Sequence, residues 1–296
     1  MASTEVTRRR RSVPGDPERG SAPQPAAGGW HPAEWASELA GTAFQLLAGF
    51  SVVAFMMSGR SPAARAIPST GLRLVLVGAA FGALAAIVAV SPLGRRSGAH
   101  LNPAVTFGFW LRGHVHRHDL VGYAVAQTLG ALLASWLFVV IWGPWADDVN
   151  DARTLPAGWL GGAAAVGIEA GLTAFLLLVV FNLLSSPRTA RWTPLVMIGV
   201  LAFLIRVGAP YTSASMNPAR TLGPAVAADG FGYLWVYFLG PPLGALIAAG
   251  LFKALLPERR TLTAKLFHDH RYPTTMKSQL PAQPAQPASG SRRAPP

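Results

Sequence analysis

The chain has 296 residues, of which 51% are hydrophobic and 13% charged, and its net charge is +12. Soluble globular chains usually carry about 25% charged residues, so this composition predicts a membrane protein. Cysteine is absent, which excludes disulfides and thiolate metal sites. The positive charge gathers in the two Pro-rich ends rather than on a folded face, and it predicts the flanks of a membrane domain with no nucleic-acid partner.

Six segments predict membrane-spanning helices, each of which needs about 20 mostly apolar residues. In chain order they are 37–57, 71–90, 120–142, 160–184, 192–205 and 231–252, with the fifth shorter than the others. No strand pattern competes with them. The spans predict an all-α membrane protein whose membrane domain covers residues 30–256.

The placement of lysine and arginine predicts the orientation of these spans. If both termini are cytoplasmic, most of the 25 Lys and Arg residues lie on the inside, which is the usual bias. We therefore predict a multi-pass protein of the plasma membrane with both ends in the cytoplasm. Residues 1–29 and 257–296 are rich in Pro, Ala and Ser and predict cytoplasmic tails, disordered in the first case and largely so in the second.

Two stretches between the spans interrupt the helical pattern and resemble each other. Residues 97–106 read Ser-Gly-Ala-His-Leu-Asn-Pro-Ala-Val-Thr, and residues 212–221 read Thr-Ser-Ala-Ser-Met-Asn-Pro-Ala-Arg-Thr. The spans repeat as well, because Glu38 in the first corresponds to Glu169 in the fourth. Three spans per half is an odd number, so the second half is inverted. The repeats cover about 35–143 and 159–253, and such repeats share a site near the membrane midplane.

Each Asn-Pro pair predicts the start of a short helix, because Asn is a favoured N-cap and Pro a favoured first helical residue. One helix begins at Asn102-Pro103 and the other at Asn217-Pro218. Both are too short to span, so each re-enters from its own side, and two positive helix ends meet at the midplane. A passing water then accepts hydrogen bonds from both Asn amides, points its hydrogens away along the pore and relays no proton.

These stretches are similar to the paired signatures of the major intrinsic protein family, the aquaporins and glycerol facilitators. The triplets are Asn102-Pro103-Ala104 and Asn217-Pro218-Ala219, and the resemblance covers residues 38 to 253. It implies a right-handed bundle of six transmembrane helices and two re-entrant half-helices around one pore per subunit, in a homotetramer without a cofactor.

The resemblance also implies a selectivity ring above the midplane. The matching positions are Phe81, Ile205, Ala214 and Arg220, with Gly82 as the alternative to Phe81. Strict water filters usually have His where Ile205 stands, so this ring is expected to be wider and more apolar. Other positions favour a water channel instead: Thr221, Ala225 and the Tyr237-Phe238 pair.

We predict a passive channel for water that also admits small uncharged solutes such as glycerol or urea and excludes protons and ions. One alternative is a facilitator selective for glycerol, urea or a metalloid with minor water flux. The other is a secondary transporter, which also uses inverted repeats and broken helices. The chain offers no cluster of acid, base or nucleophilic residues at the pore, so we predict no enzyme activity.

Three buried or pore-mouth ionisable residues need an interpretation of their own. Buried glutamates in spans raise the hypothesis of a proton relay, but the resemblance implies that Glu38 and Glu169 hold the two loops in place. It also puts His100 near the cytoplasmic pore mouth, where packing is favoured over pH sensing. The remaining histidines predict no metal site, since ligands must converge and be oriented by further groups.

Overall fold

The computed structural model describes residues 30–257, so both predicted tails lie outside the described residues except for Pro257. Residues 30–257 form helices and no strand. Six helices are long and apolar enough to cross a membrane, as the sequence predicts. They are α1 (Pro32–Met57), α3 (Thr70–Val90), α6 (Arg117–Trp142), α8 (Gly162–Leu183), α10 (Thr193–Thr212) and α12 (Leu234–Leu255).

The predicted end of the fifth span was wrong. The span was expected to stop at residue 205, but α10 continues to Thr212 through Arg206 and Pro210. The exposed Arg206 side chain lies over Gly71, where an added Cβ would sit 2.9 Å from its Nε. The Arg206 guanidinium therefore lies on the outside of the bundle, and α10 continues past it. Pro210 has no N–H to donate to the carbonyl oxygen of Arg206, and it lies in the last turn, so α10 ends two residues later at Thr212.

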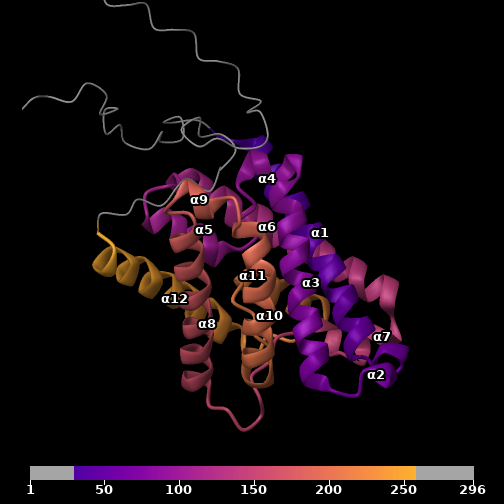
Figure 1. Cartoon of the computed structure of the whole chain (residues 1–296). Helices are drawn as coiled ribbons and strands as arrows, with labels where there is room; N and C mark the ends of the chain where they lie inside the picture. The colour runs from indigo at the N-terminus through magenta and orange to yellow at the C-terminus, as the bar shows by residue number, and fades with distance from the viewer. Residues whose placement is uncertain (1–29, 258–296) are drawn as a thin grey trace, which may run out of the picture.

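Several one-turn helices were not predicted from the sequence. Four of them begin with Pro at the first helical position, where its fixed φ suits the helix and its missing N–H costs nothing. They are α2 (Pro62–Ala66), α4 (Pro92–Ser97), α7 (Pro144–Asp147) and α9 (Pro187–Ala190). A short 3₁₀ turn, η1 (Asn150–Ala152), follows α7. These turns lie in the loops at the two ends of the bundle (Figure 1).

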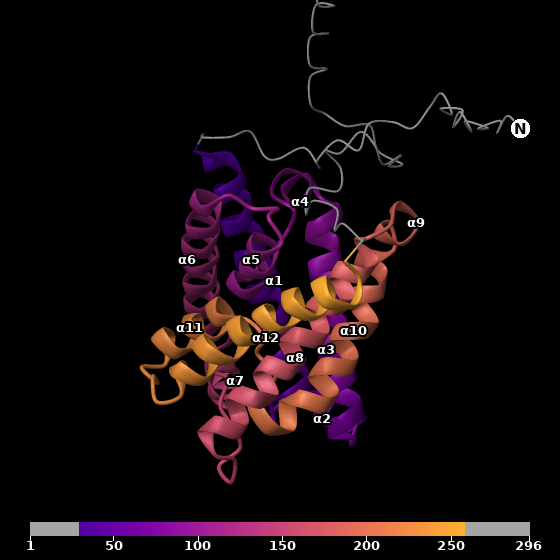
Figure 2. The same ribbon diagram turned by 90° about the vertical axis from the view of Figure 1, so that its left-hand side faces the viewer.

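The spanning helices pair closely at glycines. Helix α1 packs along α6, α8 along α12, and α3 along α10, and Figure 2 shows α8, α10 and α12 together. An added Cβ on Gly130 would lie 2.5 Å from the carbonyl oxygen of Leu39, and one on Gly244 would lie 2.4 Å from that of Ala170. Small residues let membrane helices approach backbone to backbone. The two glycines hold corresponding places in the two halves, so the repeat extends to the packing.

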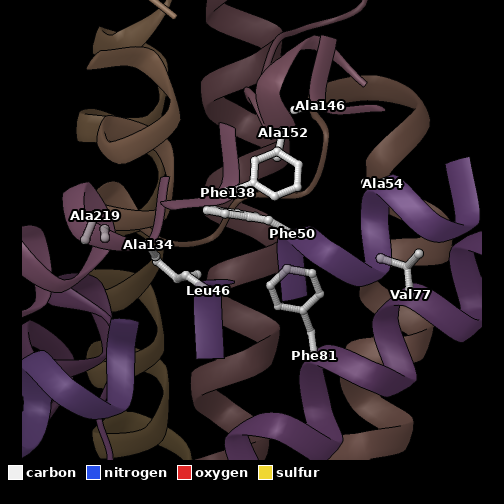
Figure 3. Packing of buried hydrophobic residues seen from close by; sticks show 11 residues of the cluster. Leu46, Phe50, Ala54, Val77, Phe81, Ala134, Phe138, Ala146, Ala152 and Ala219 are labelled. Atoms are coloured by element: carbon white, nitrogen blue, oxygen red, sulfur yellow. The ribbon is translucent and has the colours of Figure 1, made fainter. Parts of the chain in front are cut away.

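Two half-helices, α5 (Pro103–Leu111) and α11 (Pro218–Ala227), complete the fold. Beside α11 an apolar cluster joins α1, α3 and α6, and it includes Phe50, Phe81 and Phe138 (Figure 3). The Phe50 and Phe138 rings lie 5.6 Å apart. This packing fixes the wall against which the second half-helix lies.

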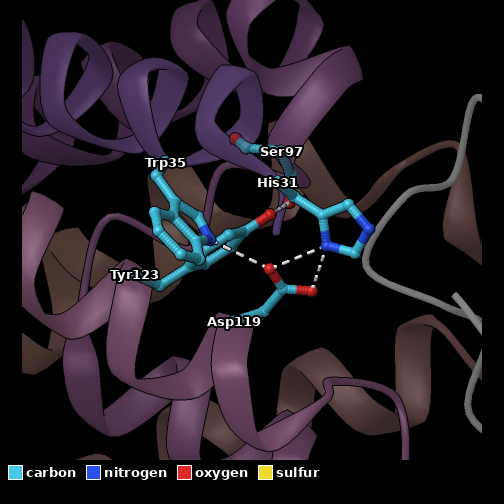
Figure 4. Close-up of polar contacts among 5 residues, drawn as sticks. All are labelled: His31, Trp35, Ser97, Asp119 and Tyr123. Atoms are coloured by element: carbon cyan, nitrogen blue, oxygen red, sulfur yellow. Dashed lines mark hydrogen bonds and ion pairs between the residues drawn. The ribbon is translucent and has the colours of Figure 1, made fainter. Parts of the chain in front are cut away.

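A polar cluster anchors the start of α1 (Figure 4). Asp119 accepts a hydrogen bond at 2.9 Å from Trp35 Nε1 and contacts His31 Nδ1 at the same distance. One turn further along α6, the Tyr123 hydroxyl donates to the carbonyl oxygen of Ser97 at 2.7 Å. The loop before α5 is thereby tied to α6, and α6 to α1.

Candidate functional site

The two Asn side chains cap the half-helices as the sequence predicts. Asn102 Oδ1 accepts a hydrogen bond from the Ala104 N–H at 2.8 Å. Asn217 Oδ1 accepts from the N–H groups of Ala219 and Arg220 at 3.0 and 3.2 Å. Both Asn residues have extended backbone and precede Pro at the first helical position. Each cap therefore places the positive end of its half-helix at the Asn side chain.

The same two amides also tie the loops to each other. Asn102 Nδ2 donates to the carbonyl oxygen of Met216 at 2.8 Å, and Asn217 Nδ2 donates to that of Leu101 at 3.0 Å. Leu101 and Met216 have φ values of 54° and 52°, in the left-handed region that L-residues seldom adopt. Their strained backbone turns each carbonyl toward the opposite half. Each Asn NH₂ has two hydrogens, so one remains for a permeating molecule.

Two buried glutamates hold the strained loops. Glu38 accepts hydrogen bonds from the N–H groups of His100 and Leu101 at 3.0 and 2.7 Å. Glu169 accepts from those of Ser215 and Met216, also at 3.0 and 2.7 Å. Both carboxylates are completely buried. The two carboxylates thus make matching hydrogen bonds to the backbone of the two loops.

The polar network beside each glutamate differs between the halves. In the first half, Gln127 Nε2 donates to Glu38 at 2.8 Å and contacts the Thr106 hydroxyl at 3.1 Å. His100 Nδ1 contacts the same hydroxyl at 3.1 Å, and its ring stacks on Phe109. These contacts place His100 in a packed, hydrogen-bonded position.

In the second half, hydroxyl groups replace the imidazole and the amide. Thr221 Oγ1 lies 2.6 Å from Ser215 Oγ and 2.8 Å from Thr154 Oγ1. The Thr212 hydroxyl donates to Glu169 at 2.7 Å. Thr221 therefore helps to fix the second loop, a contact that the sequence did not reveal.

One cavity of about 550 Å³ contains both loops and the four predicted ring positions. Phe81, Ile205, Ala214 and Arg220 all line it. Gly82 does not, because an added Cβ there would lie 2.5 Å from the Ile198 Cα, at the packing surface between α3 and α10. The geometry thus separates the two alternatives for the α3 position in favour of Phe81.

The arginine of the predicted ring is held by groups that the sequence did not indicate. Arg220 Nη1 donates to the carbonyl oxygen of Ala152 at 2.7 Å, and its Cζ lies 5.2 Å from the centre of the Phe50 ring. Ala152 follows Asn150 and Asp151, and all three have positive φ. Such a run costs free energy at a non-glycine residue, and it points a backbone acceptor at Arg220. A backbone acceptor has no side-chain signature, so only the structure could identify it.

Charged groups gather where the cavity opens beside η1. Asp148 lines this end and accepts a hydrogen bond from the Ser58 hydroxyl at 2.7 Å. That hydrogen bond, with the nearby charge of Arg60 at 3.2 Å, lowers the pKa of Asp148. The carboxylate therefore stays ionised at neutral pH and ties the end of α1 to α7.

Comparison with known proteins agrees with this architecture. A model of the major intrinsic protein family matches residues 32–252. The chain is 37% identical over 182 residues to glycerol uptake facilitator protein-like 6 of Lactiplantibacillus plantarum, covering 60% of this chain and 82% of that protein. It is 33% identical over 206 residues to aquaporin Z of Brucella melitensis, covering 67% of this chain and 90% of that protein.

A solved structure has the same fold. The aquaglyceroporin from Plasmodium falciparum superposes with a TM-score of 0.64 at 22% identity, over 76% of this chain and 97% of that chain. Six spans and two half-helices that meet across one cavity define a membrane channel. The chain belongs to the major intrinsic protein family, and it is a passive transmembrane channel for water and small solutes.

Proposed function

We propose that this channel conducts water as its main permeant, also admits glycerol, urea or a similar small uncharged solute, and excludes protons and ions. The membrane in question is the plasma membrane, and both termini lie in the cytoplasm. The functional unit is a homotetramer whose subunits each contain one pore, in a membrane domain over residues 30–256. It uses no cofactor and catalyses no reaction.

The pair of capped half-helices supports the exclusion of protons. Asn102 and Asn217 each keep one amide hydrogen after the cross-loop bond is made. A water between them accepts both hydrogens through its oxygen and directs its own hydrogens toward the two pore ends. Each helix end adds about half a positive charge, which opposes the entry of a cation.

Solute choice is proposed to lie at the ring of Phe81, Ile205, Ala214 and Arg220. This proposal depends on the apolar side chain of Ile205, which lines the cavity. A His at this position would supply a hydrogen-bond donor and narrow the passage. With Ala214 beside it, Arg220 supplies the ring's only polar side chain. This composition suits solutes with both an apolar edge and hydroxyl or amide groups.

The same observation supports the second candidate function, a facilitator selective for glycerol, urea or a metalloid with minor water flux. The relative in Lactiplantibacillus plantarum carries a glycerol facilitator name, and the one in Brucella melitensis an aquaporin name. The ratio of water to solute permeability of the wild-type channel separates the two functions.

The substitution Ile205→His tests the ring. In proteoliposomes studied by stopped-flow light scattering, we expect it to lower glycerol and urea permeability more than water permeability. Val207→His is the matched control, because Val207 lies on the same helix and is exposed on the outside. Equal losses of water and solute flux in Ile205→His, or the same selective loss in Val207→His, would contradict the assignment of Ile205.

A further inference from the structure

Two polar side chains on the spanning helices line the cavity outside the ring: Thr193, the first residue of α10, and Gln45, in the middle of α1. Gln45 lies on α1, lines the cavity and is 9% exposed. The other cavity residues contributed by α1 are apolar, as are all those contributed by α3 and α8. Burying an amide costs about 1–3 kcal/mol unless it finds hydrogen-bond partners, so its presence on this wall needs a cause.

The inverted repeat shows that the fold does not require an amide here. Three buried residues of α1 recur at the corresponding positions of α8: Thr42 as Thr173, Leu46 as Leu177 and Phe50 as Phe181. In the same register, Gln45 corresponds to Leu176, which also lines the cavity. Leucine fills this position in the second half, so the glutamine is a departure from the symmetric packing.

The hydrogen bonds of Gln45 leave most of its amide unused. Its Nε2 donates to the carbonyl oxygen of Phe81 at 3.5 Å, which is long for such a bond. This contact requires the NH₂ to face the carbonyl, so the amide oxygen points elsewhere. Within residues 30–257, Oε1 accepts no hydrogen bond, and this oxygen keeps some accessible surface. It is therefore open to the cavity.

The position of Gln45 along the pore follows from its two neighbours. Glu38, two turns earlier on α1, holds the loop that ends in Asn102. Phe81, whose carbonyl Gln45 contacts, belongs to the ring. Along α1, Gln45 therefore lies beyond Glu38 and the loop that it holds, at the level of the Phe81 backbone.

We propose that Gln45 forms a solute-binding position in the pore, where its Oε1 accepts a hydrogen bond from a hydroxyl or N–H group of the passing solute. It takes small molecules with several donors, such as polyols or urea, and favours them over equally sized molecules with fewer donors. The inference rests on the proposed passage of neutral solutes, and it adds a selecting residue outside the ring.

The test compares glycerol with propylene glycol, which has the same carbon chain and one hydroxyl fewer. Gln45→Leu copies the symmetric residue Leu176, and Gln45→Met removes the amide while keeping an unbranched chain. In proteoliposomes we expect both variants to lower the glycerol-to-propylene glycol permeability ratio by about two- to tenfold, the range that one net hydrogen bond supplies. Water permeability measured on the same vesicles shows that the variants fold and conduct.

Each result decides the inference. An unchanged glycerol-to-propylene glycol ratio in both variants would overturn the role of Gln45 and leave the proposed function standing. A fall in the permeability of both solutes alike would also overturn it, because a displaced Phe81 changes the width of the pore and not the preference for donors. A wild-type channel that conducts water but neither glycerol nor urea would overturn this inference together with the proposed solute flux.

Discussion

The substitution Glu169→Gln tests whether one buried carboxylate holds the second re-entrant loop. Glu169 Oε1 accepts from Ser215 N–H and the Thr212 hydroxyl, and Oε2 accepts from Met216 N–H. Glutamine keeps one oxygen and replaces the other by NH₂, a group that cannot accept. One buried donor therefore loses its partner while the shape of the side chain is kept.

One buried donor without a partner costs about 1–3 kcal/mol. For a chain of this size, each kcal/mol shifts the melting temperature by about 2–4 °C, so we expect Glu169→Gln to lower it by about 2–12 °C. Glu169→Ala leaves both loop N–H groups without a partner and adds a cavity, so its loss is expected to be larger.

The assay is thermal unfolding in detergent, paired with water permeability in proteoliposomes. Asp147→Asn is the matched control, because Asp147 is an exposed carboxylate in the loop after α6 and its substitution makes the same chemical change. An unchanged melting temperature and water permeability in Glu169→Gln would show that the loop keeps its strained backbone without the carboxylate, contrary to this prediction.

Two further predictions concern packing and pH. An added Cβ at Gly82 would lie 2.5 Å from the Ile198 backbone, whereas one at Gly199 meets nothing within 4 Å. We therefore expect Gly82→Ala to lower the yield and the melting temperature of the protein in detergent. Gly199→Ala is the control and should leave both unchanged. Burial, assisted by the positive charge of Arg112, lowers the pKa of His114 from 6.5 to about 4. Since the folded pKa is the lower one, the stability due to neutral His114 is complete above about pH 6.5 and is lost as the pH falls toward 4. The melting temperature should fall over that range, and less in His114→Gln; parallel curves for the two proteins would contradict this.

Features with a local signal could be predicted from the sequence. The Asn-Pro pairs predict helix starts because the capping chemistry lies within the pair itself, and the structure places both half-helices there. Glu38 and Glu169 hold corresponding positions in the two repeats, and they make matching hydrogen bonds to the two loops. The predicted end of the fifth span was wrong because Arg206 does not end the helix, and α10 continues past it to Thr212.

Features that depend on distant parts of the chain could not be predicted in this way. The Ala152 carbonyl that accepts from Arg220 belongs to a loop 68 positions away, and any residue type carries such a carbonyl. Gln45 stands in an apolar segment like any tolerated polar residue. Only the rotation of α1 in the bundle shows that this side chain lines the cavity.

We propose that this pore conducts water and small neutral solutes while it blocks protons. Proteoliposomes containing the wild-type protein test it most directly, with water, glycerol, urea and proton fluxes measured on one preparation against empty vesicles. We expect water permeability well above that of empty vesicles with a low activation energy, measurable glycerol or urea flux, and a proton flux no greater than that of the lipid alone. Water permeability equal to that of empty vesicles, or a proton flux that rises with the amount of protein, would contradict it.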